Sequence, residues 1–237
     1  MDLLPGYREL RPPEALRGVV ACFWVRVTSQ VGEVRVLPDA CTDVVWRRGE
    51  GTTIAGPDTS PKLVGRAPGD VTVGMRLLPG AGGRVLGVPL DELRDLRVDV
   101  AAVDRAFDLD AEAEPTAVIQ RLAAAVRERE ADPLVAAAAR MLHRLDVDAI
   151  AREVAMSERQ LRRRFHAAVG YGPKTLERIL RFRRVVRALD QGRRDFAALA
   201  FEAGYADQAH LTRETKRLAG LSPAKLARTL SAPAPRA

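Results

Sequence analysis

The sequence has 237 residues, 47% of them hydrophobic and 29% charged, and 38 Lys+Arg against 31 Asp+Glu give a net charge of +7. This composition supports one large or two modest domains with a buried core, and it excludes a disordered polyelectrolyte. Two cysteines exclude a disulfide scaffold, and no apolar run reaches the ~20 residues of a membrane span or forms a secretion signal, so we expect a cytoplasmic protein with no membrane partner.

The first 110 residues are predicted to form a small β-rich domain. Short β-branched runs separated by Gly, Pro and Asp turn signals indicate strands, and two short helices are expected to follow them. The strands are expected at 19–28, 34–37, 43–47 and 71–77, and the helices at 80–88 and 89–96.

Residues 111–132 are predicted to link this domain to a second one. Pro115 stands where the first turn of a helix tolerates proline, and Val118 and Leu122 share one apolar stripe. A second helix is expected from Pro133 to about residue 145. These two helices either pack on the β-rich part or take part in dimer formation.

The basic charge is concentrated in the second half of the chain. Residues 1–132 contain 17 Lys+Arg and 21 Asp+Glu, a net charge of −4, whereas residues 133–237 contain 21 and 10, a net charge of +11. Such an asymmetry indicates two domains with different partners, and the basic domain is expected to face nucleic acid or another anionic surface.

The basic half contains an internal repeat with a period near 50 residues, which is the strongest signal in the sequence. Each copy is predicted to form a helix, a tight turn and a second helix, the pattern of a helix-turn-helix motif. Ser157 with Gln160 has the pattern of a capping box that begins the second helix of the first copy, and Asp207 is the expected cap in the second copy. The aligned segments are 151–156 with 200–205 and 170–178 with 220–228.

A long helix over 173–191 is predicted to join the two copies. About 18 residues at ~1.5 Å each give a rod of roughly 27 Å, which suits two reading helices placed in successive major-groove segments ~34 Å apart. The outward faces of the reading helices are basic and polar, and arginine, glutamine and threonine are side chains that read base edges. These outward residues are Arg159, Arg162, Arg163 and Arg164 in the first copy, and Gln208, His210, Thr212, Arg213, Lys216 and Arg217 in the second.

Residues 133–230 resemble the AraC/XylS family of bacterial transcription regulators. The resemblance rests on 155–157 (AMS), 161–165 (LRRRF), 170–173 (GYGP), 204–213 (GYADQAHLTR) and 220–223 (GLSP). It implies that base edges are read by Arg159, Arg162, Arg163, Gln208, His210, Thr212 and Arg213. We expect phosphate contacts or helix caps from Ser157, Arg181, Arg184, Asp207 and Lys216.

Two positions depart from the family pattern. The family has phenylalanine where this chain has Thr215, fifty residues after Phe165, and this change either weakens the packing of the second motif or implies a compensating contact. The first turn has Ala155 where the family has glycine, and we expect a helical or near-helical backbone there. The N-terminal half is more loosely similar, at 37–45, 55–57 and 78–81, to a domain of actinobacterial-type members, which implies no particular ligand.

Thiol and aromatic side chains of the β-rich domain are the candidates for an effector pocket: Cys22, Trp24, Cys41 and Trp46. The alternatives are that these side chains are core residues or that the thiols are redox-active. Asp39 and Asp43 form a candidate carboxylate pair, for which turn and solvent chemistry is the commoner role.

The sequence carries no pattern typical of catalysis or of a cofactor site. His143, His166 and His210 lack metal-ligand spacing, and neither a nucleophile elbow nor a phosphate-binding loop is present. No catalytic residue, metal ligand or cofactor is therefore predicted.

The sequence predicts an α+β protein, with a β-rich regulatory or partner domain at 1–110, a linking region at 111–132 and an all-α domain at 133–237 that has two helix-turn-helix motifs joined by a long helix. We expect a sequence-specific DNA-binding transcription regulator, activator or repressor. Its expected partners are double-stranded DNA, RNA polymerase and an unidentified small-molecule effector. We expect it at the nucleoid, and a homodimer is the candidate assembly. Two alternatives stay open: an N-terminal domain that only dimerises or contacts proteins, and an enzyme fused to a DNA-binding domain.

Overall fold

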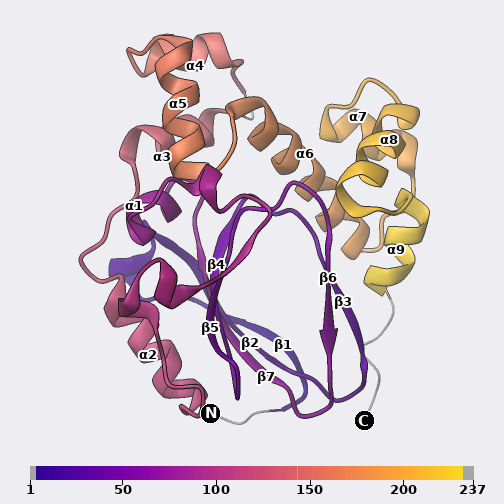
Figure 1. Ribbon diagram of the computed structural model, residues 1–237. Helices are drawn as coiled ribbons and strands as arrows, with labels where there is room; N and C mark the ends of the chain where they lie inside the picture. The colour runs from indigo at the N-terminus through magenta and orange to yellow at the C-terminus, as the bar shows by residue number, and fades with distance from the viewer. Residues whose placement is uncertain (1–3, 143, 232–237) are drawn as a thin grey trace.

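The computed structural model describes residues 4–142 and 144–231, in which a β-rich part is followed by a helical part (Figure 1). An antiparallel six-stranded sheet has the strand order β1-β2-β7-β4-β5-β8, and β3 pairs with β6 in a separate antiparallel ribbon. The strands are β1 (Gly6–Leu10), β2 (Val20–Val27), β3 (Gly32–Val36), β4 (Thr42–Arg47), β5 (Gly51–Ala55), β6 (Lys62–Arg66), β7 (Val71–Leu77) and β8 (Arg97–Asp99). The predicted fold class, a β-rich domain before an all-α one, is confirmed.

Alternation along the strands gives the six-stranded sheet one apolar and one polar face. In β4, Val44 and Trp46 are completely buried, and the residues that alternate with them, Asp43, Val45 and Arg47, face the opposite side. The apolar face can therefore join a core while the polar face stays available for a different role.

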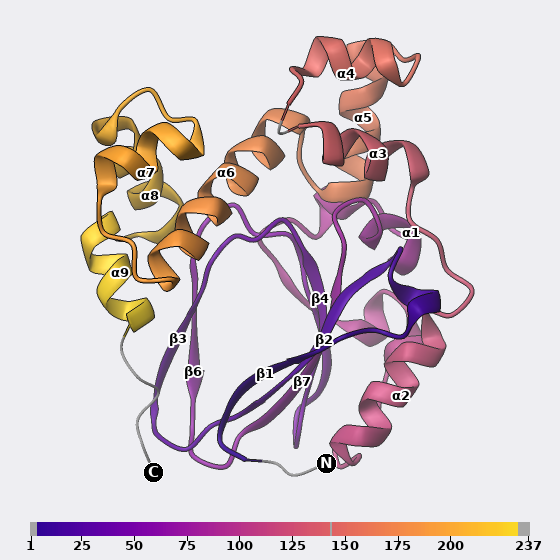
Figure 2. The ribbon, with the colours of Figure 1, turned by 180° about the vertical axis from the view of Figure 1, so that it is seen from behind.

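The apolar face is covered by α2 (Pro115–Ala125), which contributes Val118 and Leu122 to the N-terminal core. In Figures 1 and 2, α2 lies on one side of the sheet and the β3–β6 ribbon lies on the other. The N-terminal part thus has three layers, and residues 115–125, which the sequence places in a linking region, pack as part of its core.

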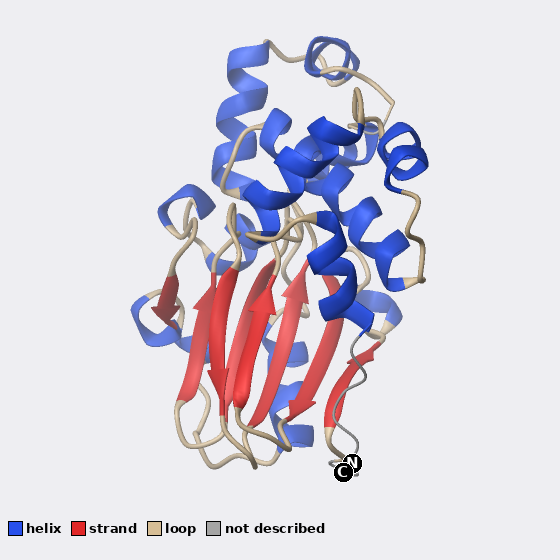
Figure 3. Cartoon of the chain, turned by 90° about the vertical axis from the view of Figure 1, so that its right-hand side faces the viewer, coloured by secondary structure: helices blue, strands red, loops and turns tan. Residues whose placement is uncertain are grey.

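The helical part forms a second core, in which both helix-turn-helix motifs pack around one long helix. Its elements are α3 (Pro133–Met141), α4 (Val147–Glu153), α5 (Glu158–Val169), α6 (Pro173–Asp190), α7 (Phe196–Ala203), α8 (Gln208–Ala219) and α9 (Pro223–Ser231). Leu161 and Phe165 of α5, Phe182 of α6 and Leu211 of α8 are fully buried in this core. Figure 3 shows the helices gathered beyond one end of the strands.

The turn of the first motif is more strained than the sequence indicates. Ala155 has φ +52°, in the left-handed region, and the corresponding Gly204 has φ +82°. The expected helical or near-helical backbone at Ala155 is therefore wrong, because the chain reverses there through a conformation that crowds a β-carbon. The predicted capping box is present: the Ser157 hydroxyl accepts from the Gln160 amide, and the Gln160 side chain accepts from the Ser157 amide.

Four strands are not predicted by the sequence pattern, namely β1, β5, β6 and β8. Each is short, and glycine or charged residues interrupt its apolar alternation. The expected helices also shorten: α1 covers Gly82–Leu86, and the segment expected at 89–96 contains a 3-10 turn, η2, at Leu90–Glu92. His143 lies outside the described residues. No helix among the described residues is long and apolar enough to cross a membrane.

Candidate nucleic-acid interface and ligand pocket

The second helix of the first motif, α5, presents arginines to solvent. Leu161 and Phe165, one turn apart, are buried and hold α5 against the core. Arg162 is exposed and forms an ion pair with Glu158 at 2.8 Å. The exposed arginines of α5 are Arg159, Arg162 and Arg163. This helix therefore has the basic outward face that contact with nucleic acid requires.

The corresponding helix of the second motif, α8, presents a mixed polar face. Asp207 caps α8 by accepting a hydrogen bond from the His210 amide at 2.6 Å, and the Thr212 hydroxyl donates to the Gln208 carbonyl at 2.9 Å. The His210 ring meets the Tyr205 ring edge-on, with 5.2 Å between centroids. The exposed polar side chains of α8 are Gln208, Arg213, Lys216 and Arg217. Thr212 and His210 are thus partly engaged within the motif, whereas the exposed residues project from it.

The two arginines of α6 that are expected at phosphates have different surroundings. Arg181 forms an ion pair with Glu177, and its guanidinium lies over the Tyr205 ring, 5.5 Å from the centroid. Arg184 is exposed. Arg181 therefore ties α6 to the second motif, and Arg184 is the better placed of the two to meet a phosphate.

The two motifs are attached to the N-terminal domain in different ways. The C-terminal end of α5 packs closely on α1 and η2, where a β-carbon added at Gly83 would come within 2.3 Å of the Ala167 carbonyl oxygen. The second motif is reached by Arg35 of β3, whose Nη1 donates to the Ala219 carbonyl, at the end of α8, at 3.2 Å. The first motif is therefore held by close backbone packing, and the second is contacted through the tip of a long side chain.

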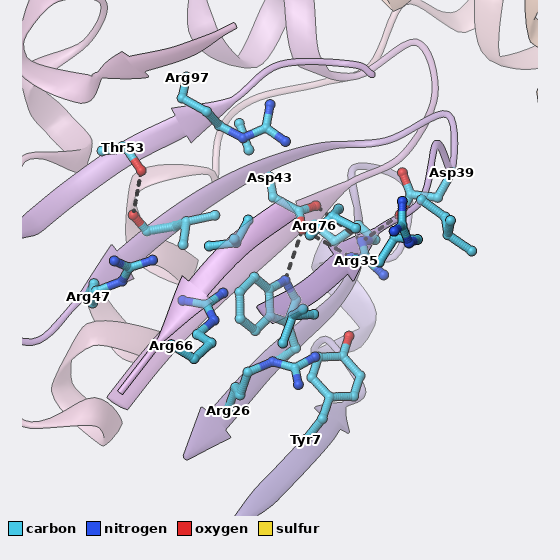
Figure 4. Close-up of a pocket in the computed structure, with 17 residues that line it drawn as sticks. Tyr7, Arg26, Arg35, Asp39, Asp43, Arg47, Thr53, Arg66, Arg76 and Arg97 are labelled. Carbon is cyan, nitrogen blue, oxygen red and sulfur yellow. Dashed lines mark hydrogen bonds and ion pairs between the residues drawn. The ribbon is translucent and has the colours of Figure 1, made fainter. Parts of the chain in front are cut away.

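A cavity of about 440 Å³ lies between the polar face of the six-stranded sheet and the β3–β6 ribbon. This volume is within the range of roughly 300–1,000 Å³ found for small-molecule sites. Trp24 lies across Gly74, where an added β-carbon would come within 2.0 Å of the indole, and the Tyr7 ring is 5.9 Å from that of Trp24. The apolar lining residues are Val34, Val36, Leu37, Val45, Ala55 and Val64. Figure 4 shows that arginines surround this apolar centre.

One end of the cavity holds an arginine whose charge is matched. Arg76 donates from Nε and from Nη2 to the two oxygens of Asp43, each at 3.1 Å, and it also pairs with Asp39 at 3.2 Å. The Trp24 indole donates to Asp43 at 3.1 Å. Burial raises the pKa of Asp43, although Arg76 opposes the shift. The predicted carboxylate pair therefore serves to hold Arg76 and to orient Trp24.

Of the four residues predicted for an effector pocket, Trp24 lines this cavity. Trp46 lies on the opposite face of the sheet, completely buried, and its indole donates to the Asp110 carbonyl at 2.9 Å. Cys22 and Cys41 are buried, and neither is among the described residues that line the cavity. Burial raises the pKa of Cys22 to about 11 and that of Cys41 well above its usual value, so both thiols are protonated at neutral pH.

Sequence reasoning missed the arginines of the cavity. They come from six different strands, and the only local signal is the alternation of polar residues in strands such as β4. Within the described residues, no group of three or more His, Cys, Asp or Glu side chains is arranged to hold a metal ion.

Comparison with known proteins matches each half of the chain to a known domain. A helix-turn-helix domain matches residues 150–229, and a domain of unknown function (DUF6597) matches residues 8–99. A putative AraC-like transcription regulator of Streptomyces antibioticus is 38% identical over 100 residues, which are 39% of this chain and 32% of that protein. The chain thus spans about a third of the length of this curated relative.

Two solved structures align with parts of the chain. ToxT from Vibrio cholerae, bound to (E)-4-(8-methylnaphthalen-1-yl)but-3-enoic acid, aligns with a TM-score of 0.50 and 10% identity over 88% of this chain and 99% of that chain. The C-terminal domain of AraT, a response regulator from Geobacillus stearothermophilus, aligns with a TM-score of 0.39 and 21% identity over 41% of this chain and 86% of that chain. The alignment with ToxT covers both the β-rich and the helical part, and it shows a shared fold.

Two motifs with exposed basic helices and the matched family define a helix-turn-helix protein of the DNA-binding class. More particularly, the chain resembles the AraC/XylS family, and the match to a putative AraC-like transcription regulator over 39% of the chain supports the resemblance that the sequence carries. The curated relative is a putative transcription regulator.

Proposed function

We propose that the protein is a sequence-specific transcription regulator that reads two successive major-groove segments with α5 and α8 and responds to a small molecule bound in its N-terminal domain. The observation that carries this proposal is the pair of exposed polar helix faces joined by the 18-residue α6. At ~1.5 Å per residue, α6 holds the motifs roughly 27 Å apart end to end. One copy of the chain therefore suffices to contact both segments.

The exposed side chains divide into two roles. Arg159 and Arg163 have the donor geometry for guanine, and Gln208 has the donor and acceptor that adenine requires. Arg184 and Lys216 are proposed to bind phosphate oxygens, which sets orientation on the duplex without reading sequence. The net charge of +11 over residues 133–237 supports this division, because it makes the helical part a general attractor for the DNA backbone.

Selection of binding sites from a random double-stranded DNA library with the full chain tests the proposal. We expect two blocks of preferred bases with centres about one helical turn, ~10 base pairs, apart. Arg163→Ala should relax the preference at one base position in one block, and Gln208→Ala should do so in the other. Arg121→Ala, an exposed position on α2, should change neither block. Recovery of a single block, or of no preference, would contradict reading by both motifs.

The cavity favours an effector domain over a domain that only dimerises or contacts proteins. A 440 Å³ space with an apolar centre and charged ends is the form of a ligand site rather than of a flat interface. ToxT, which shares the fold, has been solved with a small organic molecule bound. A thermal-shift screen of metabolites on the full chain tests this choice, and a screen without any shift would favour the dimerisation alternative.

We infer that the protein acts on bacterial DNA in the cytoplasm, at the nucleoid, and that RNA polymerase is its protein partner. The homodimer is the assembly proposed for the regulator when it occupies paired sites. Mass photometry with and without the selected DNA distinguishes one copy from two on a site, and co-purification with RNA polymerase on promoter DNA tests the second partner.

A further inference from the structure

Strand register brings three arginines together at one end of the cavity. Arg26 of β2 and Arg47 of β4 are both paired with Thr72 of β7, which lies between them. The side chains of Arg26, Thr72 and Arg47 therefore share one row on the polar face of the sheet. From the ribbon, Arg66 of β6 reaches the same point, with its Nη1 3.4 Å from the Thr72 hydroxyl oxygen. We call Arg26, Arg47 and Arg66 the arginine cluster, which Figure 4 shows at the end of the cavity away from Asp39.

The arginine cluster is short of negative charge. Arg47 pairs with Glu50 at 2.9 Å, but among the described residues neither Arg26 nor Arg66 forms an ion pair with a carboxylate. Arg26 instead lies over the Tyr7 ring, 4.8 Å from its centroid. Nε of Arg66 is buried and has no hydrogen-bond partner in the part of the chain that the structure describes. The cluster therefore contrasts with Arg76 at the other end of the cavity, which two aspartates neutralise.

Like charges held partly out of water are unfavourable unless a counter-charge is supplied. Burial lowers the pKa of Arg66, and the neighbouring Arg47 and Arg26 lower that pKa further. Burial also lowers the pKa of Arg26. A bound anion would offset the repulsion among the three guanidinium groups and would give the orphaned Nε of Arg66 an acceptor.

We propose that the arginine cluster binds the acidic group of an organic anion whose apolar part extends along Val34, Val45 and Val64 toward Trp24. Guanidinium groups recognise carboxylate and phosphate oxygens in a planar, two-pronged geometry. Both acids share this chemistry, and the valines of the ribbon and of β4 favour an organic ligand over a bare inorganic ion. The inference names the ligand class for the proposed effector site, and its regulatory meaning rests on the proposed function.

Thermal unfolding of the full chain at fixed ionic strength tests the proposal with defined probes. The probes are octanoate, 4-phenylbutyrate, the primary amides of both, and inorganic phosphate. We expect the two acids to raise Tm in a saturable manner, phosphate to raise it less, and the amides to leave it unchanged. Equal shifts for acids and amides, or no shift with either acid, would overturn the proposal. A phosphate shift as large as that of the acids would assign the cluster to inorganic phosphate and overturn its organic part.

Substitution of the cluster locates the effect. Arg66→Met and, separately, Arg26→Met should weaken binding of 4-phenylbutyrate by roughly tenfold or more, because each removes charge-assisted hydrogen bonds. Arg121→Met, an exposed arginine on α2 at the opposite face of the sheet, is the matched control and should bind as the wild type does. Circular dichroism checks that each variant is folded. Because there are two cluster variants, the test remains possible if one of them fails to fold. Unchanged affinity in both folded cluster variants would overturn the assignment. These measurements involve no DNA, so their failure leaves the DNA-reading proposal standing, and the site selection tests that separately.

Discussion

Replacing Thr215 with valine should stabilise the helical domain. Thr215 lies on α8 and is completely buried, and among residues 4–142 and 144–231 its hydroxyl oxygen has no hydrogen-bond partner. Burial of such a hydroxyl costs about 1–3 kcal/mol in proteins. Valine keeps the shape and has nearly the same helix propensity. We expect a gain of about 1–2 kcal/mol, which at ~2–4 °C per kcal/mol for a chain of this length raises Tm by roughly 2–8 °C.

Differential scanning calorimetry of the DNA-free protein measures this shift. Thr212→Val is the matched control on the same helix, because the Thr212 hydroxyl donates to the Gln208 carbonyl, and its removal should bring no gain. DNA affinity should be unchanged in Thr215→Val, since Thr215 faces the core. A Tm at or below that of the wild type would refute the reasoning, because it would mean that the Thr215 hydroxyl is bonded in the folded protein.

Three further predictions concern the turn, the DNA contacts and the thiols. Ala155→Gly should raise the free energy of unfolding by about 1 kcal/mol, because glycine adopts φ +52° without strain. The control, Ala149→Gly inside α4, should lower the free energy of unfolding by ~1 kcal/mol. Urea denaturation compares the two variants, and a lower free energy of unfolding for Ala155→Gly would contradict the prediction. Arg213→Ala should cost roughly 1–3 kcal/mol on the selected site and relax one base position, whereas Arg184→Ala should weaken binding to all sequences alike and reduce the salt slope by about one. Fluorescence anisotropy on selected and random DNA separates the two, and equal losses on both DNAs for Arg213→Ala would remove its base-reading role. Alkylation of Cys22 by iodoacetamide should be slow at pH 7 and accelerate roughly tenfold per pH unit toward pH 9. Only the thiolate reacts, and the raised pKa of about 11 keeps the thiolate fraction small. Rapid labelling of the folded protein at pH 7, measured by mass spectrometry, would instead favour a redox role for Cys22.

The helical half could be predicted from the sequence because its signals are local. Two helix starts show this. The capping box of Ser157 and Gln160 begins α5, the cap at Asp207 begins α8, and each signal lies within four consecutive residues of the sequence. The repeat adds to this evidence, since two copies with the same order of helix, turn and helix constrain each other, and the second copy differs by one extra residue just after its turn. Ala155 is the exception: the sequence shows which residue departs from the pattern, but the φ angle depends on how α4 and α5 pack.

The cavity could not be predicted, because its lining depends on strand register. Trp24 and Trp46 are the same residue type in neighbouring parts of the sheet, yet alternation places one in the cavity and the other in the core. The arginine cluster unites Arg26, Arg47 and Arg66 only because two of them pair with Thr72 and the third arrives from the separate ribbon. Such pairing joins residues far apart in the chain, and no short window of sequence contains it.

Arg35 links the cavity to the second helix-turn-helix motif. It lines the cavity from β3, and its guanidinium donates to the Ala219 carbonyl at the end of α8. Coupling between two binding sites is reciprocal, so a ligand that changes the affinity for DNA by some factor has its own affinity changed by DNA by the same factor. Communication through this one side chain would make each promoter an effector of the cavity. The ligand concentration that half-saturates the cavity would then differ from one promoter to the next.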